Sequence, residues 1–149
     1  MSRIKDLNKL GHSVWLDFIR RSLIDSGELE ALIARGVSGV TSNPTIFEKA
    51  IAGSADYDEA LRELAEEGKT NDEIYLALAL DDIRRAADLL RPVWDKTGGV
   101  DGYVSLEANP KLAYDTAGTV AEARMLFRAL GRPNVMIKVP ATPEGIPAI

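Results

Sequence analysis

The sequence predicts an α/β protein with parallel strands, and two observations support this prediction. Four short, largely apolar runs are typical of strands. Segments with helical periodicity and helix-ending residues separate these runs. Because a helix between two strands returns the chain to the same end of the sheet, this alternation favours parallel pairing. The predicted strands are 14–19, 39–43, 103–108 and 134–140.

The first two predicted helices flank the second strand. Asp25 and Glu28 have the spacing of a capping box, in which side chains satisfy the free amides of a helix start. We expect that helix to end at Gly36, because glycine readily adopts the left-handed conformation that terminates helices. An amphipathic pattern over 54–67 predicts a second helix. The short segment before the first strand also has helical character.

Two longer helices are predicted in the second half of the chain. Thr70 and Glu73 form another capping box, which opens a long helix before the third strand. Thr119 and Glu122 repeat this spacing before the fourth strand, and Gly131 ends the helix that they open.

The composition describes a globular protein made of one module, residues 1–149. The chain is 46% hydrophobic and 28% charged, with no linker-like region or internal repeat. Its net charge of −5 argues against nucleic-acid-binding proteins, which are normally basic. The lack of cysteine excludes disulfide scaffolds, cysteine metal sites and thiol nucleophiles. No apolar run approaches the roughly 20 residues of a membrane span, so we expect a cytoplasmic protein without a membrane partner.

Each predicted strand carries polar or charged residues near its C-terminal end. These residues are Asp17, Thr41 with Asn43, Glu107 and Lys138. In α/β barrels the chemistry is located at the C-terminal ends of the strands. Residues two positions apart share a face of a strand, so Thr41 and Asn43 are predicted on one side. We therefore expect an acid, an amide, a second acid and an amine to converge at one edge of the sheet.

Lys138 is the most informative of these residues. It stands late in the apolar run 134–140, although lysine normally keeps its ammonium group in water. Burial disfavours the ammonium form and leaves a nucleophilic amine near neutral pH. Such an amine is what Schiff-base chemistry with a ketone requires.

Each residue also has a purely structural interpretation. Lys138 would extend from the strand end to solvent, as long basic side chains commonly do. Asp17 would pair with a neighbouring arginine, and Asn43 with Pro44 would form only a turn. Glu107 would be an ordinary carboxylate at a strand end.

Four longer motifs contain these residues and occur in order along the chain. They are 14–21 (VWLDFIRR), 39–49 (GVTSNPTIFEK), 101–107 (DGYVSLE) and 133–142 (PNVMIKVPAT), and they resemble successive signatures of bacterial transaldolases. The resemblance implies a (β/α)₈ TIM barrel of the class I aldolase type. It also implies a pentose phosphate pathway enzyme that needs no metal or organic cofactor. Such enzymes transfer a three-carbon dihydroxyacetone unit from a ketose phosphate, sedoheptulose 7-phosphate or fructose 6-phosphate, to an aldose phosphate.

The resemblance also implies a role for each site residue. Lys138 matches the family's Schiff-base lysine, and Asp17 matches the acid/base group that handles a hydroxyl proton during carbon–carbon cleavage. Glu107 matches the carboxylate that assists imine formation through a water molecule. Asn43, with Thr41 nearby, matches polar groups that hold the dihydroxyacetone part of the substrate.

The chain departs from this family in the number of its strands. Four strand units are only about the first half of an eight-stranded barrel, which typically has about 250 residues. The arginine-based phosphate site of the family has no counterpart here. Three interpretations follow: the N-terminal part of a longer, truncated transaldolase, a half-barrel that pairs with itself or with a separate C-terminal chain, or a different fold.

Two alternative functions remain open from the sequence. The chain is then either another Schiff-base aldolase acting as a lyase, or a catalytically incomplete half-barrel without activity of its own. Sugar phosphates are the expected substrates in the enzyme interpretations, and no nucleic-acid partner is expected.

Overall fold

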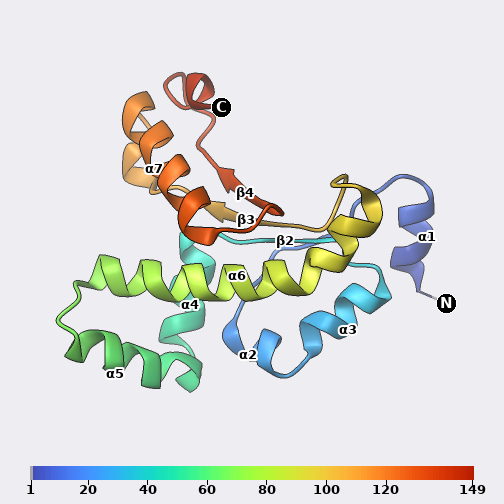
Figure 1. Cartoon of the computed structure of the whole chain (residues 1–149), viewed down its shortest axis with the longest axis horizontal. Coiled ribbons are helices and arrows are strands. Elements are labelled where there is room, and N and C mark those ends of the chain that lie inside the picture. Colours follow the sequence, from blue (N-terminus) through green and yellow to red (C-terminus); the bar gives the residue numbers. More distant parts are fainter. Residues whose placement is uncertain (1) are drawn as a thin grey trace.

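The computed structural model describes residues 2–149 and contains one four-stranded sheet. All neighbouring strands are parallel, and they follow one another across the sheet in chain order (Figure 1). This arrangement confirms the predicted α/β class and is compatible with part of a TIM barrel. The strands are β1 (Trp15–Leu16), β2 (Gly39–Thr41), β3 (Tyr103–Glu107) and β4 (Val135–Lys138).

The strands lie where the sequence predicts them, but each is shorter than predicted. The first strand ends at Leu16, because the chain bends away from the sheet at Asp17. The second ends at Thr41, and two residues separate it from the next helix. The fourth ends before Pro140, which has no backbone N–H for a strand ladder.

Seven α-helices and three short 3₁₀ segments accompany this sheet in the described part of the chain. In Figure 1 the long helix α6 runs beside the strands, and α7 lies next to β3 and β4. The helices are α1 (Arg3–Lys9), α2 (Arg21–Asp25), α3 (Glu28–Arg35), α4 (Pro44–Ala52), α5 (Asp58–Glu66), α6 (Asn71–Thr97) and α7 (Thr116–Leu130). The 3₁₀ segments are η1 (Ala55–Tyr57), η2 (Pro110–Leu112) and η3 (Ile146–Ala148).

The hydrophobic core lies between the sheet and the helices. Val104 and Leu106 of β3 are buried there, together with Ile83 and Leu90 of α6. Alternation along the strand places Ser105 and Glu107 on the opposite face of β3. The two faces of the sheet therefore differ: one packs against helices, and the other carries the polar residues predicted from the sequence.

One predicted limit is confirmed in each of three helices. At the start of α6, the Thr70 hydroxyl accepts a hydrogen bond from the Glu73 amide, and the Glu73 carboxylate accepts one from the Thr70 amide. Gly131 ends α7 with φ +61°, a conformation that favours glycine. Gly36 ends α3 in the same region of conformational space, with φ +115°.

The predicted capping box at Asp25 is wrong. Asp25 is the last residue of a separate helix, α2, and its carboxylate pairs with Arg85 of α6. Helix α3 begins after Gly27, whose φ of +77° makes the turn between the two helices. A tertiary ion pair thus engages the side chain that the sequence pattern assigned to a local cap.

The predicted start of α7 is four residues too late. Asp115 caps this helix through a 2.9 Å hydrogen bond from the amide of Gly118. Thr119 lies inside the first turns and is buried, with its hydroxyl donating to the Leu112 carbonyl. The Thr119 pattern therefore marks a buried polar contact and not a helix start.

Two helices, α2 and α4, were not predicted, and another is divided. Helix α4 follows Asn43 directly, and Pro44 occupies its first turn, where the missing N–H has no consequence. The interpretation of this pair as only a turn is therefore wrong. The helix predicted over 54–67 consists of the 3₁₀ segment η1 and the following α5.

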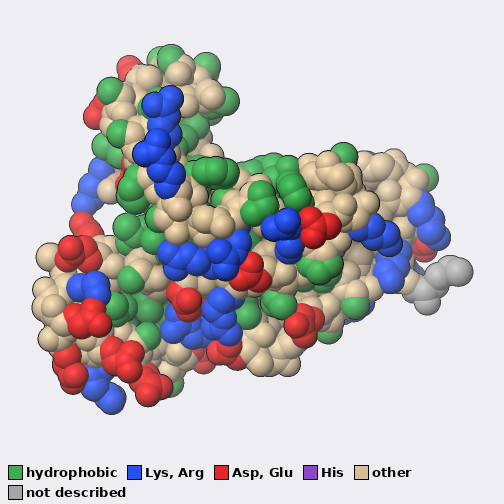
Figure 2. Space-filling view, in the orientation of Figure 1, with side chains coloured by type: hydrophobic (Ala, Val, Ile, Leu, Met, Phe, Trp, Pro, Cys, Tyr) green, Lys and Arg blue, Asp and Glu red, His purple; other side chains and the backbone are tan. Residues whose placement is uncertain are grey.

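The surface of the molecule has a charged and an apolar region in the view of Figure 2. Acidic side chains gather over α5, at the lower left of this view. Exposed hydrophobic residues include Met125 and Phe127 on α7 and Met136 on β4. No helix within residues 2–149 has the length and apolar character needed to cross a membrane.

Candidate active site

The strand register brings the predicted site residues of three strands together. Thr41 of β2 is the neighbour of Ser105 on β3, and Glu107 of β3 is the neighbour of Lys138 on β4. These four side chains lie on the sheet face opposite the helices, near the C-terminal ends of the strands. The expected convergence at this edge is therefore found for Thr41, Glu107 and Lys138.

The Lys138 amine lies between a hydroxyl and a carboxylate. Its Nζ donates to Thr41 Oγ1 at 3.1 Å and lies 3.4 Å from Glu107 Oε2. Ser105 Oγ donates to the same Thr41 oxygen at 2.9 Å. Because Thr41 accepts both hydrogen bonds, its own hydroxyl proton remains available for another acceptor.

Lys138 is partly exposed, which differs from the predicted dry environment. Its side chain is 36% exposed, and the Glu107 side chain is 29% exposed. The lysine does not extend freely into solvent either, because Thr41 and Glu107 hold its amine. The amine is thus oriented by partners and still accessible to a small molecule.

Asn43 lies just beyond the end of β2 and caps helix α4. Its Oδ1 accepts a 2.9 Å hydrogen bond from the amide of Ile46. This contact fixes the side-chain orientation and leaves the two donors of the amide group for other partners. The same residue therefore starts a helix and presents an N–H group at the edge of the sheet.

An open hollow of about 540 Å³ connects Asn43 with the two predicted acids. Asp17 and Glu107 both line it, so three predicted site residues surround one space. Asp17 is exposed at the end of β1. The complete lining is Asp17, Asn43, Pro44, Thr45, Ile46, Lys49, Glu107 and Pro110.

The structural interpretation of Asp17 as an arginine partner is wrong. Arg20 approaches Asp56, with Nε 3.4 Å from Oδ2, and Arg21 binds Asp81 and Asp82 on α6. The two arginines that follow Asp17 thus have other partners. Asp17 instead lines the hollow that it shares with Asn43 and Glu107.

Lys49 and Tyr75 also lie near the site and were not predicted. Lys49 lines the hollow from α4, where it lies one turn after Thr45. A prediction of this helix from the sequence would have placed Lys49 on the same face as Thr45. Tyr75 comes from α6 and lines a second cavity of about 280 Å³ together with Glu107. Burial, and then the charge of Glu107, raise the pKa of the Tyr75 hydroxyl. No local sequence signal connects Tyr75 with the site.

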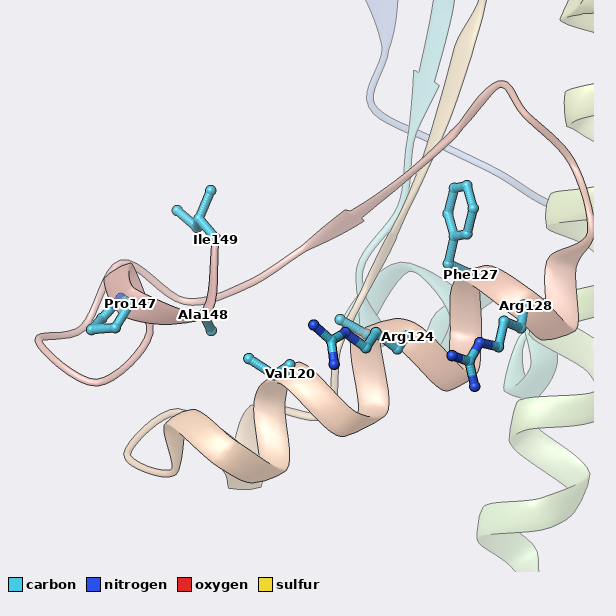
Figure 3. A pocket seen from close by; sticks show the side chains of 8 residues that line it. Val120, Arg124, Phe127, Arg128, Pro147, Ala148 and Ile149 are labelled. Atoms are coloured by element: carbon cyan, nitrogen blue, oxygen red, sulfur yellow. The ribbon is translucent and has the colours of Figure 1, made fainter.

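Another hollow lies away from these residues, between α7 and the C-terminal segment. Figure 3 shows Arg124, Phe127 and Arg128 on α7, with Pro147 and Ile149 on the segment that follows β4. None of the predicted site residues lines this hollow. Among residues 2–149, no group of three or more His, Asp or Glu side chains is placed to hold a metal ion.

Comparisons with known proteins give a consistent result. The model of the Transaldolase/Fructose-6-phosphate aldolase family matches residues 14–149. A transaldolase of Thermobifida fusca is 55% identical over 149 residues, which are 99% of this chain and 40% of that protein. Transaldolases of Thiobacillus denitrificans and Trichodesmium erythraeum are 51% and 46% identical, again over 99% of this chain, and 42% and 39% of their own lengths. The chain thus spans about two fifths of the curated relatives it matches.

Proposed function

This chain belongs to the transaldolase/fructose-6-phosphate aldolase family, and from this premise we propose that it carries the Schiff-base part of a transaldolase active site. One observation supports the proposal most directly. The Lys138 amine lies 3.1 Å from the Thr41 hydroxyl and 3.4 Å from the Glu107 carboxylate, at the edge of the sheet. A lysine with an adjacent carboxylate has the arrangement that covalent catalysis on a ketone needs.

The first proposed step joins Lys138 to the ketose. The neutral amine attacks the ketone carbon, and the carbonyl oxygen becomes the hydroxyl of a carbinolamine. Loss of this oxygen as water then gives the imine. Glu107 is close enough to accept a proton from the ammonium group and to return it, through a water molecule, to the departing oxygen.

The second proposed step breaks a carbon–carbon bond. The protonated imine on Lys138 withdraws the electron pair of the bond between C3 and C4 of the ketose, which forms an enamine. Asp17 accepts the proton of the C4 hydroxyl, so that the departing part leaves as an aldehyde. The enamine then attacks the carbonyl carbon of an acceptor aldose, whose oxygen takes the proton back from Asp17. Hydrolysis of the resulting imine releases the product ketose and frees the Lys138 amine, which completes the transfer of three carbons.

Two neutral residues are proposed to hold the three-carbon unit. Thr41 has a hydroxyl proton available, and Asn43 has a free amide N–H₂ because its oxygen caps α4. Both groups face the edge at which Lys138 and the hollow lie. They provide donors for the hydroxyl oxygens of dihydroxyacetone without adding charge.

The proposed substrates follow from the family relationship. They are a ketose phosphate as donor and an aldose phosphate as acceptor, in the pentose phosphate pathway of the cytoplasm. We propose that residues 1–149 form the N-terminal portion of a barrel whose remaining strands provide the phosphate contacts, either in the same polypeptide or from a paired chain. The proposed reaction assigns no step to a metal or an organic cofactor.

A trapping experiment tests this proposal. The chain is incubated with fructose 6-phosphate and sodium borohydride, and reduced adducts are located by intact mass and peptide mapping. We expect an adduct on Lys138 and none in Lys138→Met, whereas Lys96→Met, which removes an exposed lysine near the end of α6, retains it. An adduct of equal yield in Lys138→Met contradicts the assignment. A folded chain that forms no adduct would instead support an incomplete half-barrel.

The family description also includes fructose-6-phosphate aldolases, which suggests a second candidate function. A lyase would release free dihydroxyacetone at the rate of cleavage, without acceleration by an added aldose. A transaldolase would show the opposite, since the enamine waits for an acceptor. The curated relatives named above are transaldolases, and this favours the first candidate.

A further inference from the structure

The connection that carries Asp17 is short and is held at both of its ends. It runs from Asp17 to Arg20, between the two-residue strand β1 and helix α2. On one side, β1 is paired with β2. On the other side, Ile19 is fully buried in the core. The position of the Asp17 carboxylate therefore depends on what fixes the start of α2.

The start of α2 is capped by residues far away in the sequence. Its own N-cap residue, Arg20, makes no side-chain cap. Instead, the Arg21 amide donates to the Tyr57 hydroxyl at 3.0 Å, and the Ser22 amide donates to Asp56 Oδ2 at 3.2 Å. The 3₁₀ segment η1 thus satisfies free amides that would otherwise need local caps.

A buried carboxylate on α6 holds this arrangement in place. Asp82 is 0% exposed and accepts hydrogen bonds from Tyr57 Oη at 2.8 Å and from Arg21 Nε at 3.0 Å. Arg21 also reaches Asp81 at 3.1 Å, and its guanidinium lies 4.9 Å from the centre of the Tyr57 ring. Helices α2 and α6 and the segment η1 are therefore joined through the Tyr57 hydroxyl and the Arg21 guanidinium.

The network is buried, and burial limits how much it stabilises the fold. Burial raises the pKa of the Asp82 carboxyl, whereas the hydrogen bond from Tyr57 and the charge of Arg21 lower it. Buried ion pairs often contribute no more stability than apolar side chains of the same volume, whereas one unpaired member is costly. The network therefore favours a single placement of α2.

We infer that Tyr57 and Asp82, acting through Arg21, are positioning residues that hold Asp17 at the mouth of the site. This inference rests on the proposed role of Asp17 in carbon–carbon cleavage. The Tyr57 hydroxyl is the central atom, since it accepts from the start of α2 and donates to the buried carboxylate. Imine formation at Lys138 does not depend on this connection, because β2, β3 and β4 position that residue.

Amide hydrogen exchange tests whether Tyr57 holds the connection that carries Asp17. Tyr57→Phe removes one oxygen and keeps the ring, and Tyr114→Phe is the control because Tyr114 is 77% exposed. We expect Tyr57→Phe to accelerate exchange at the amides of residues 17–22 by about tenfold, equal to roughly 1.4 kcal/mol of local opening. Exchange in β3 and β4 should change less than twofold. Unchanged exchange at residues 17–22 overturns the inference.

Borohydride trapping with fructose 6-phosphate tests whether this connection affects carbon–carbon cleavage. An uncleaved imine is reduced to a six-carbon adduct, whereas cleavage followed by protonation of the enamine gives a three-carbon adduct. We expect Tyr57→Phe to lower the ratio of three-carbon to six-carbon adducts at least fivefold, with total adduct on Lys138 within twofold. Asp82→Asn should lower this ratio as well, and Asp17→Asn should leave mainly the six-carbon adduct. The Tyr114→Phe control should keep the ratio of the unsubstituted chain.

The two readouts separate failure of the inference from failure of the proposed function. Faster exchange with an unchanged adduct ratio overturns the positioning role of Tyr57. No adduct of either length in the unsubstituted chain contradicts the proposed function, and exchange then still decides whether the network holds the connection that carries Asp17. A loss of all adducts confined to Tyr57→Phe would indicate general damage and also overturns the inference.

Discussion

Substitution of Gly39 by alanine provides a direct steric test of how β1 is held against β2. Gly39 pairs with Trp15, and the indole ring lies against the glycine. A Cβ atom at position 39 would lie 2.3 Å from Trp15 Cε2 and 2.4 Å from Cδ2. Real carbon atoms do not approach so closely, so the ring or the whole of β1 must move. Because β1 has only two residues, little backbone pairing resists this movement.

The expected change in the free energy of unfolding of Gly39→Ala follows from two opposing effects. Overpacking costs about 1–3 kcal/mol. Alanine also restricts the unfolded chain, which offsets about 0.4–1 kcal/mol of this cost. We expect the free energy of unfolding of Gly39→Ala to fall by about 1–2 kcal/mol, measured by urea denaturation followed by circular dichroism at constant m-value.

A double-mutant cycle isolates the contact. Trp15→Leu removes the ring, and the double variant Trp15→Leu/Gly39→Ala should recover most of the cost assigned to Gly39→Ala. A coupling energy above about 0.5 kcal/mol is expected for residues in contact. Strict additivity, or a cost of Gly39→Ala below that value, would refute the steric reasoning.

Two further predictions concern stability. Asn134 is buried, and its side-chain amide donates to the carbonyls of Ala87 and Gly102, at 2.8 and 2.9 Å. Asn134→Ala should therefore lower the free energy of unfolding by about 1–3 kcal/mol in urea denaturation, and an effect below about 0.5 kcal/mol would contradict this. Two hydrogen bonds from Arg132, at 2.6 and 2.9 Å, lower the pKa of Asp88. The pair therefore stabilises the fold at pH values above the usual carboxyl pKa, and this stabilisation is lost as the pH falls through the lowered pKa. Because both side chains are substantially exposed, Arg132→Gln should lower the free energy of unfolding only slightly at pH 7 and not at all once Asp88 is protonated. An equal loss at both pH values would show a different cause.

The helix signals in the sequence were reliable where side chains act locally. Thr70 and Glu73 form the predicted capping box, because both partners lie within one turn of the same helix. Asp25 has the same spacing to Glu28 but pairs with Arg85, sixty residues later, and this competitor is visible only in the folded chain. The spacing of a capping box is therefore not sufficient evidence for a cap.

The candidate site was predictable residue by residue, but its arrangement was not. Thr41, Glu107 and Lys138 were identified from their places at strand ends, and the structure brings them together. Asn43 was expected on a strand face and instead caps α4. Tyr75 was not predicted, because it lines a cavity with Glu107 from a helix whose packing the sequence pattern does not specify.

The sequence by itself determined the order of the four strands, their alternation with helices, the parallel sheet and the residues that carry chemistry at the strand ends. These features follow from periodicity and local propensity, which act over a few residues. Only the tertiary structure decided the contacts of Lys138, the hollow beside Asp17 and the network of Tyr57 and Asp82. Such contacts join residues dozens of positions apart, and strand register and helix packing select them among many competing pairs. For this reason Lys138, Thr41 and Glu107 could be predicted from the sequence, but the distances between them could be obtained only from the tertiary structure.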